Sequence, residues 1–276
     1  KAWEGLGYYS RARHLLHAAN EVVKRHDGIV PSNPKELEKL KGIGPYTKGA
    51  ILSIAFGQAE PAVDGNVMRV ISRILKLEEN IAEVRVRKMI EAYVREMIKA
   101  HNPSSFNQAL MELGALICTP KNPTCLLCPV QQHCRAFAEG LETELPIKIK
   151  EKKQKRLAYV ALLIKNSNGE YVIEKRPENG LLANLWQFPM VPIDEIGKDH
   201  IQPYVFGEYG IHIDLKEKKG NIKHVFTHLI WNLEVYEAEV ADESFALDRR
   251  ACYTSKNELE KYPFPVSHQK MMRYID

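Results

Sequence analysis

The sequence lacks any apolar stretch long enough to cross a lipid bilayer, and it lacks a basic segment followed by an apolar one near its start. Neither a helical membrane protein nor a chain with a secretory leader is indicated. Internal repeats and low-complexity tracts are also missing, which argues against a repeat architecture. The 276 residues are 45% hydrophobic and 27% charged, which is ordinary for a folded protein and leaves room for two domains.

The chain has little excess charge of either sign, with a formal net charge of +4. One segment, PIKIKEKKQKR (146–156), carries six basic residues and one acidic residue. We interpret this segment as a solvated linker, with contact to a DNA backbone as the second possibility.

Cysteine is scarce as well, and four of the five cysteines lie within residues 118–134. Without an export signal we expect a reducing compartment, so clustered thiols indicate metal ligands rather than disulfides. The spacing C-x6-C-x2-C-x5-C leaves zinc and iron–sulfur both open. The ligand candidates are Cys118, Cys125, Cys128 and Cys134, and we expect Cys252 to be a buried or free thiol.

The spacing of apolar residues changes along the chain. Residues 1–140 show helical periodicity, as in SRARHLLHAANEVVKRH (10–26), and NPKELEKL begins with Asn33 as a helix cap followed by Pro34. Residues 141–157 form a basic linker in this reading. In residues 158–276, apolar and polar residues alternate instead, as they do in strands. We predict a hairpin at Asn168-Gly169, a strand over 228–240 and a short helix over 255–262. The sequence therefore predicts an all-α domain followed by an α/β domain.

A Gly-Ile-Gly turn lies between two predicted helices in LKGIGPYTKGA (40–50). Gly42 can adopt a positive φ angle and end the first helix, and Gly44 leaves the backbone bare beside the next helix, which Pro45 begins. Open N–H groups at a helix N-terminus bind anions. An ordinary helix–helix connection, in which the glycines only permit close packing, remains an equal alternative on this stretch alone.

Asp64 follows in VDGNVMR (63–69), directly before another predicted helix, where an N-cap is the simpler interpretation. The order of the motifs adds information that no single motif carries. LKGIG-P-Y-T, then V-D-G-N-V-M-R and then the cysteine cluster resemble the helix-hairpin-helix superfamily that includes endonuclease III. GLGYYSRARHL and FNQALMELGALICTP narrow the resemblance to MutY-type adenine DNA glycosylases, and it covers nearly the whole chain.

The resemblance implies a multidomain protein. An all-α helix-hairpin-helix glycosylase domain with a [4Fe–4S] cluster loop (118–134) would be followed by an α/β Nudix-like lesion-recognition domain. The implied reaction is hydrolysis of the N-glycosidic bond of adenine opposite 8-oxoguanine, and also opposite guanine, in base-excision repair. The implied cofactor is a [4Fe–4S] cluster bound by Cys118, Cys125, Cys128 and Cys134, with a structural and DNA-binding role.

The resemblance also assigns the catalytic positions. Asp64 would stabilise the positive sugar that develops as the bond breaks, and Asn66 would help to hold that geometry. The relatives that also cleave the strand carry a nucleophilic lysine at the position of Tyr46. Lys48 lies two residues away from that position. We therefore expect a monofunctional glycosylase.

The same resemblance places DNA contacts in both parts of the chain. The N–H groups of Gly42, Ile43 and Gly44 would grip a phosphate, and Tyr8 would be a wedge beside the lesion, where a buried packing tyrosine is the alternative. Gln108 matches a residue of the adenine pocket, although an exposed polar residue on an amphipathic helix is the simpler alternative.

In the second domain, HVFTHLIW (224–231) matches the loop that reads 8-oxoguanine in the family. Phe226, Thr227 and His228 take the three reading positions, with Thr in place of the usual Ser; without the resemblance we would favour an ordinary strand. The Nudix signature is degraded, since Pro203 replaces its arginine and Tyr204 and Gly207 replace two of its glutamates. We therefore do not expect metal-dependent pyrophosphate hydrolysis.

One expected group is missing. The family's general acid is a glutamate upstream of the region that matches this chain, and neither Glu4 nor Glu112 corresponds to it. Because the chain begins with Lys1 in a region that reads as helical, we expect that it is truncated at its N-terminus, exposes apolar helix faces and is inactive as it stands.

The expected partner is double-stranded DNA with adenine opposite 8-oxoguanine. We expect the protein to be a monomer and not to bind a membrane. The expected location is the cytoplasm, at a bacterial-type nucleoid. Three other functions stay open: a lyase acting on damaged pyrimidines, a lesion-binding module without activity, and a Nudix nucleotide hydrolase.

Overall fold

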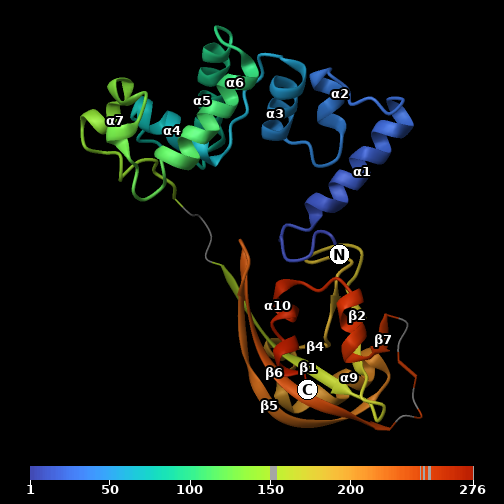
Figure 1. Cartoon of the computed structure of the whole chain (residues 1–276). Coiled ribbons are helices and arrows are strands. Elements are labelled where there is room, and N and C mark those ends of the chain that lie inside the picture. The colour runs from blue at the N-terminus through green and yellow to red at the C-terminus, as the bar shows by residue number, and fades with distance from the viewer. Residues whose placement is uncertain (150–153, 243, 245, 248–249, 276) are drawn as a thin grey trace. The chain divides into compact units, whose positions relative to one another are not determined.

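The structure is a computed structural model that describes residues 1–149, 154–242, 244, 246–247 and 250–275. Contacts divide the chain into a helical unit, Ser10–Glu151, and a sheet unit that joins Lys1–Tyr9 to Lys152–Asp276 (Figure 1). Lys1–Tyr9, predicted as the start of the helical domain, thus groups with the sheet unit, because the Phe264 N–H donates a hydrogen bond to the Glu4 carboxylate. Residues 150–153 of the predicted linker lie outside the described residues.

The helical unit follows the predicted order of helices. Its elements are α1 (Ser10–Arg25), α2 (Pro34–Lys39), α3 (Pro45–Phe56), α4 (Gly65–Leu75), α5 (Val84–Ile98), α6 (Pro103–Glu112), a π-helical turn (Leu113–Ile117), two 3₁₀ turns (Cys125–Leu127 and Gln131–His133) and α7 (Arg135–Ala138). No helix in the described part of the chain is long and apolar enough to span a membrane.

Local sequence explains where these helices begin and how they pack. The Asn33 side chain accepts hydrogen bonds from the N–H groups of Lys35 and Glu36 and so caps α2, as predicted. One core cluster joins α1, α2 and α3, and a second joins α4, α5 and α6. The apolar residues Leu15, Leu16 and Val23 of α1 stay 63%, 66% and 67% exposed. The expected exposed apolar helix face is therefore present on α1.

The sheet unit contains the predicted hairpin and the predicted strand over 228–240. Its elements are β1 (Lys155–Lys165), β2 (Tyr171–Lys175), β3 (Trp186–Gln187), β4 (Met190–Pro192), α8 (Ile193–Ile196), a 3₁₀ turn (Lys198–His200), α9 (Ile201–Tyr209), β5 (His212–Val225), β6 (Leu229–Asp242), β7 (Ala251–Thr254), a 3₁₀ helix (Lys256–Lys261), α10 (Val266–Gln269) and a last 3₁₀ turn (Met272–Tyr274).

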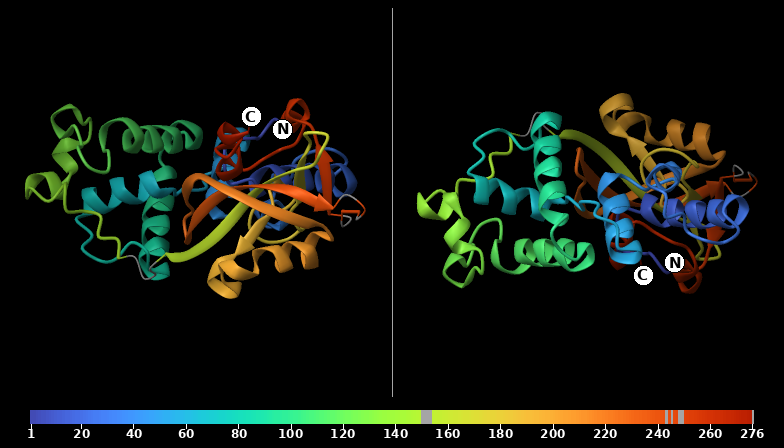
Figure 2. Two further views of the ribbon diagram at one scale, coloured as in Figure 1. Left: turned by 90° about the horizontal axis from the view of Figure 1, so that it is seen from below. Right: turned by 90° about the horizontal axis from the view of Figure 1, so that it is seen from above.

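The described strands form one mixed sheet in the order β3-β2-β1-β6-β5, with β4 also paired to β1 and β7 to β2. The central strand β1 runs parallel to β6 from Lys155 opposite Leu229 onward, and antiparallel to β2. Both views of Figure 2 show the start of the chain beside the C-terminal segment of this unit.

Each face of the sheet has its own core, as the alternation along β1 dictates. Val160, Leu162 and Ile164 point into a cluster that α9 covers. Ala161 and Leu163 point into a second cluster that contains Phe264 and Met271 from the C-terminal segment. The parallel pairing explains why β1 reads as a nearly continuous apolar run, since it is buried on both faces.

Candidate active site

The Gly-Ile-Gly turn connects α2 to α3 and requires its first glycine. Gly42 has φ +89°, and a Cβ atom there would lie 2.6 Å from the Cβ atom of His14 in α1. Gly44 is the N-cap of α3 and has no side chain that could cap the N–H groups of the first turn. The Ile43 N–H donates to the Leu40 carbonyl at 3.1 Å. It is therefore not among the groups left open toward an anion, in contrast to the expectation.

Asp64 occupies the N-cap of α4, where both of its oxygens have partners. Its Oδ1 accepts a hydrogen bond from the Val67 N–H at 2.8 Å, and its Oδ2 accepts one from the Asn66 side-chain amide at 3.1 Å. The simpler interpretation of Asp64 as a helix cap is thus correct, and the cap fixes the carboxylate at the end of the helix. The predicted pair Asp64 and Asn66 is brought together.

Arg69, one turn further along α4, holds this pair in place. Its guanidinium donates to the Asn66 side-chain oxygen at 2.9 Å, to the Gly114 carbonyl and, through Nε, to the Cys118 carbonyl at 2.7 Å. The residue is 8% exposed, so it is a buried part of the helical unit rather than an arginine on an exposed helix face. Gly114 allows Asn66 to pack closely against its backbone, because a Cβ atom on residue 114 would lie 2.7 Å from the Cβ atom of Asn66.

Tyr46 and Gln108 lie on helices that pack against each other. The Tyr46 hydroxyl, in the first turn of α3, is 3.5 Å from the Met111 sulfur in α6, and the residue is 42% exposed. Gln108 on α6 is exposed, and its amide donates back to Ser104 at 2.9 Å. Lys48, the lysine nearest to the position of Tyr46, is paired with Glu38 at 2.6 Å. The catalytic and pocket roles of these residues stay predictions.

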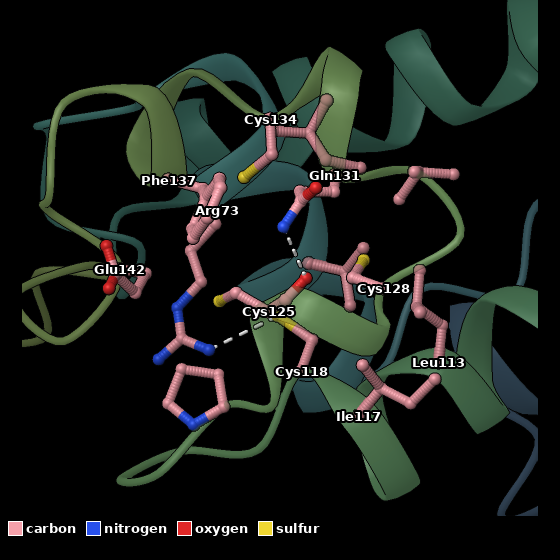
Figure 3. Close-up of a pocket in the computed structure, with 14 residues that line it drawn as sticks. Arg73, Leu113, Ile117, Cys118, Cys125, Cys128, Gln131, Cys134, Phe137 and Glu142 are labelled. Carbon is pink, nitrogen blue, oxygen red and sulfur yellow. Dashed lines mark hydrogen bonds between the residues drawn. The ribbon is translucent and has the colours of Figure 1, made fainter.

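The four clustered cysteines line one cavity between α4, α7 and the loop that precedes α7, as Figure 3 shows. All four thiols are free. Burial raises the pKa of Cys125 and of Cys134, and the charges of the other thiols raise both further. One oxygen of Glu142, which also lines the cavity, is buried without a hydrogen-bond partner among the described residues.

Arg73 closes the cavity from α4 and is 1% exposed. Its guanidinium donates to the Cys118 sulfur at 3.2 Å (Figure 3). It also donates to the carbonyl groups of Leu145, Thr119 and Pro120 at 2.9, 2.8 and 3.2 Å. Arg73 was not among the residues predicted from the sequence. Two arginines four residues apart inside the apolar stretch RVISR were the available signal, because a buried arginine needs several fixed acceptors.

The thiols do not form a closed single-ion site. No group of three or more His, Cys, Asp or Glu side chains within the described ranges is arranged to hold a metal ion. A tetrahedral zinc site would require four thiolates to converge on one atom at about 2.3 Å. All four thiols nevertheless line the same cavity, and they are close enough for their charges to raise the pKa of Cys125 and Cys134.

The predicted lesion-reading residues form the turn between β5 and β6. The Gln154 amide donates to the Phe226 carbonyl at 2.8 Å and the Lys155 N–H donates to the His228 carbonyl at 3.2 Å, so the start of β1 fixes the turn. The Phe226 ring packs edge-on against Trp231, with 4.9 Å between centroids. Thr227 and His228 are exposed, and their side chains have no hydrogen-bond partner in the part of the chain that the structure describes.

Tyr8 is exposed and has an unusual backbone. It is 71% exposed, and its φ angle of +45° lies in the left-handed region that side chains other than glycine seldom adopt. It belongs to the sheet unit, as the Phe226–His228 turn does, whereas Asp64, Tyr46, Gln108 and the cysteines belong to the helical unit. Tyr8 is therefore not a buried packing residue.

A second cavity of about 320 Å³ opens in the sheet unit at the end of α9. Tyr204 and Glu208, from the degraded Nudix signature, line it together with Glu174, Glu195 and Arg176. Glu174 accepts hydrogen bonds from Gln187 at 2.6 Å and from the Tyr209 hydroxyl at 2.9 Å. Both hydrogen bonds end on the same carboxylate oxygen, Oε1 of Glu174.

Two parts of the chain match protein families. Residues 25–54 match the helix-hairpin-helix motif, and residues 160–274 match the NUDIX domain. The chain resembles solved structures of a thermostable thymine-DNA glycosylase (30% identity, TM-score 0.42, 47% of this chain and 59% of that chain) and of a MutT protein from Methanosarcina mazei Go1 (22%, 0.39, 46% and 96%).

Curated relatives cover more of the chain. An adenine DNA glycosylase of Arabidopsis thaliana is 40% identical over 253 residues, which are 82% of this chain and 40% of the relative. Adenine DNA glycosylases of Schizosaccharomyces pombe and Homo sapiens are each 30% identical, over 94% and 85% of this chain and 66% and 52% of their own length. The chain thus spans between 40% and 66% of the length of these relatives.

Proposed function

Because the chain belongs to the family of MutY-type adenine DNA glycosylases, we propose that it is the body of a base-excision-repair enzyme. The enzyme removes adenine opposite 8-oxoguanine, and opposite guanine, by hydrolysis of the N-glycosidic bond. The observation that carries the proposal is the arrangement at α4, where Asp64 is fixed by Val67 and Asn66, and Asn66 by Arg69.

The physical role of Asp64 follows from its charge and its fixed position. Adenine is extruded from the duplex into a pocket, and positive charge then develops on the sugar as the base departs. A carboxylate held beside the sugar lowers the energy of that cation without having to reorganise. Water attacks the sugar, so the strand stays intact.

The general acid that protonates the adenine is not among the candidate residues of this chain. Glu4 accepts the Phe264 N–H at 2.9 Å and pairs with Lys1, and Glu112 is exposed at the end of α6. We propose that a glutamate outside this sequence supplies the acid, so that the chain alone binds the lesion but excises adenine poorly.

Single-turnover excision tests the proposal. This chain and a version with the upstream residues of its reading frame are compared on duplexes with adenine opposite 8-oxoguanine, with adenine opposite guanine, and with only Watson–Crick pairs. The longer version is expected to release adenine from the first two duplexes, with the first preferred. If it left adenine in place in all three, the proposed function would be wrong.

Replacing Tyr46 by lysine tests the absence of strand cleavage. In the longer version, Tyr46→Lys is expected to increase the yield of borohydride-trapped covalent DNA adduct at least about tenfold, since it supplies an amine nucleophile near the sugar. The matched control is Lys48→Met, because Lys48 is the natural lysine nearest to this position and its amine is already paired with Glu38. Efficient trapping by the unmodified chain, and its loss in Lys48→Met, would favour the lyase function instead.

We also propose that Cys118, Cys125, Cys128 and Cys134 bind a [4Fe–4S] cluster. The donor set fits, because four free thiols of one loop face one cavity. Bound there, the cluster would cross-link the loop between α6 and α7 and stabilise it. Arg73 would donate to a ligand sulfur, and Lys121 and Arg135 in the same loop would be available to phosphates.

Iron and sulfide analysis tests the cluster. The purified chain is expected to be brown, with about four iron atoms per chain and a matching amount of acid-labile sulfide. Cys128→Ser is expected to lose most of both, whereas Cys252→Ser in the sheet unit is expected to keep them. Stoichiometric zinc in a colourless protein, or equal losses in both variants, would contradict the assignment.

A further inference from the structure

The segment Lys1–Tyr9 is the start of the chain, but it packs with the sheet unit at the other end of the sequence. In Figure 1 the start of the chain lies at the edge of the sheet unit, near the segment that leads into α10. The link is made by Glu4, whose Oε1 accepts a hydrogen bond from the Phe264 N–H at 2.9 Å.

The partner of Glu4 is a rigid part of the sheet unit. The Phe264 side chain is fully buried and stacks on Phe188, with 5.3 Å between the ring centroids. The Gln269 amide donates to the Phe264 carbonyl at 2.9 Å. Phe264 also shares a core cluster with Trp231, against which Phe226 of the β5–β6 turn is packed. The anchor and the turn therefore rest on the same core.

The environment of Glu4 favours the charged form of the acceptor. Partial burial of the carboxyl opposes ionisation, but hydrogen bonds from Lys1 and from the Phe264 N–H outweigh it and lower the pKa of Glu4. A charged acceptor makes a stronger hydrogen bond to a backbone N–H than a neutral one.

The residues after Glu4 form a tight loop that presents Tyr8. The Trp3 indole N–H donates to the Gly7 carbonyl at 3.2 Å, and Gly5 and Gly7 adopt φ angles of +82° and +68°. Tyr8 follows with φ +45° and its side chain exposed. A non-glycine residue keeps such a conformation only where the surrounding structure holds it. Glu4 is a side chain of this loop that bonds directly to the backbone of the sheet unit.

We propose that Glu4 is a positioning residue that anchors the Lys1–Tyr9 loop to Phe264 and thereby holds Tyr8 and the Phe226–His228 turn on one recognition body. The inference rests on the proposed function for the roles of Tyr8 and of the turn. The anchoring itself depends only on the contacts of Glu4, so the two can fail separately.

Hydrogen exchange on this chain tests the anchoring without DNA or activity. Glu4→Ala removes the acceptor and is expected to accelerate exchange in peptides that cover residues 1–9 and 264. Glu4→Gln keeps an acceptor oxygen and is expected to restore protection. Glu36→Ala, which breaks an exposed pair with Lys39, is the control and is expected to leave these peptides unchanged. Unchanged exchange in Glu4→Ala would overturn the anchoring.

Binding by the same variants tests the positioning. The affinity of the chain is measured for a duplex with adenine opposite 8-oxoguanine and for the same duplex with guanine in place of 8-oxoguanine. The ratio of the first affinity to the second gives the preference for the lesion. Glu4→Ala is expected to lower this ratio about three- to tenfold, the usual worth of one hydrogen bond, and Glu4→Gln to retain most of it. A lower melting temperature with an unchanged ratio would reduce Glu4 to a structural role and overturn the proposal. If the unmodified chain showed no preference for 8-oxoguanine over guanine, the proposed lesion recognition would be wrong. The hydrogen-exchange result would still decide whether Glu4 anchors the loop.

Discussion

In the longer, active version of the chain, Asp64→Asn is expected to lower the single-turnover rate of adenine excision by about a thousandfold or more. The substitution replaces a negative charge by a neutral amide of the same shape at the place where the sugar becomes positive. A transition state with that much positive charge on the sugar depends on a nearby anion, whereas ground-state binding of the duplex does not. The affinity for DNA is therefore expected to change little.

Asparagine is the informative replacement because Asp64 is also a helix cap. Asparagine caps helices about as well as aspartate, so the hydrogen bond to the Val67 N–H can be retained and α4 should stay intact. Asp64→Ala would remove the cap as well, at a cost of about 1 kcal/mol, and would mix a folding effect with the chemical one. Rates are measured with enzyme in excess over the 8-oxoguanine duplex, and melting temperatures are recorded alongside.

Asp27→Asn is the matched control for Asp64→Asn. It makes the same change of charge at an exposed position with φ +50°, where asparagine is equally suited. Its excision rate is expected to stay at the wild-type level. If Asp64→Asn kept more than about a tenth of the wild-type rate, a loss below 1.4 kcal/mol, the charge of Asp64 would not stabilise the transition state.

The sequence predicted those parts of the structure that depend on local chemistry. Asn33, Pro34 and Gly42 occupy the cap, first-turn and positive-φ positions that their side chains favour. The hairpin after β1 and the strand β6 follow from alternation and from the Asn168-Gly169 turn. Caps, turns and periodicity involve neighbouring residues, so one sequence contains all the information that they need.

Contacts between distant residues were not predictable in the same way. Periodicity gave α1 an apolar stripe but could not show that Val22 is buried while Leu15 and Leu16 are exposed. Nothing near Glu4 indicates that its partner is 260 positions away, at Phe264. The motif NPKE also does not show that the Glu36 side chain pairs with Lys39, at 2.7 Å. Arg73 is the clearest case, since its partners come from two distant segments, residues 118–120 and Leu145.

Arg73→Met is expected to destabilise the helical unit by about 3 to 5 kcal/mol, because it leaves buried acceptors without a donor. The methionine fills much of the space but cannot donate to the carbonyl groups of Leu145, Thr119 and Pro120 or to the Cys118 sulfur. These acceptors belong to the cysteine loop and to the segment after α7. The loss should therefore be concentrated where the loop is held against α4.

Two measurements distinguish this effect from a general loss of stability. The melting transition of the helical unit is expected to fall by roughly 10 °C or more, and the iron content per chain is expected to fall with it. Arg73→Lys restores the charge and one donor group but not the planar fork, so it is expected to recover only part of both. Excision is expected to drop as well, since Cys118 is also a partner of Arg69 and through it of Asn66.

Arg25→Met is the matched control for Arg73→Met. Arg25 is 72% exposed and pairs with Glu21 at 2.9 Å on the surface of α1, an interaction worth less than about 1 kcal/mol. Its melting temperature and iron content are expected to match those of the unmodified chain. Equal stability of the two variants would show that the buried contacts of Arg73 do not hold the cysteine loop. A stable Arg73→Met protein without iron would instead confine the role of Arg73 to the cluster, through its hydrogen bond to the Cys118 sulfur.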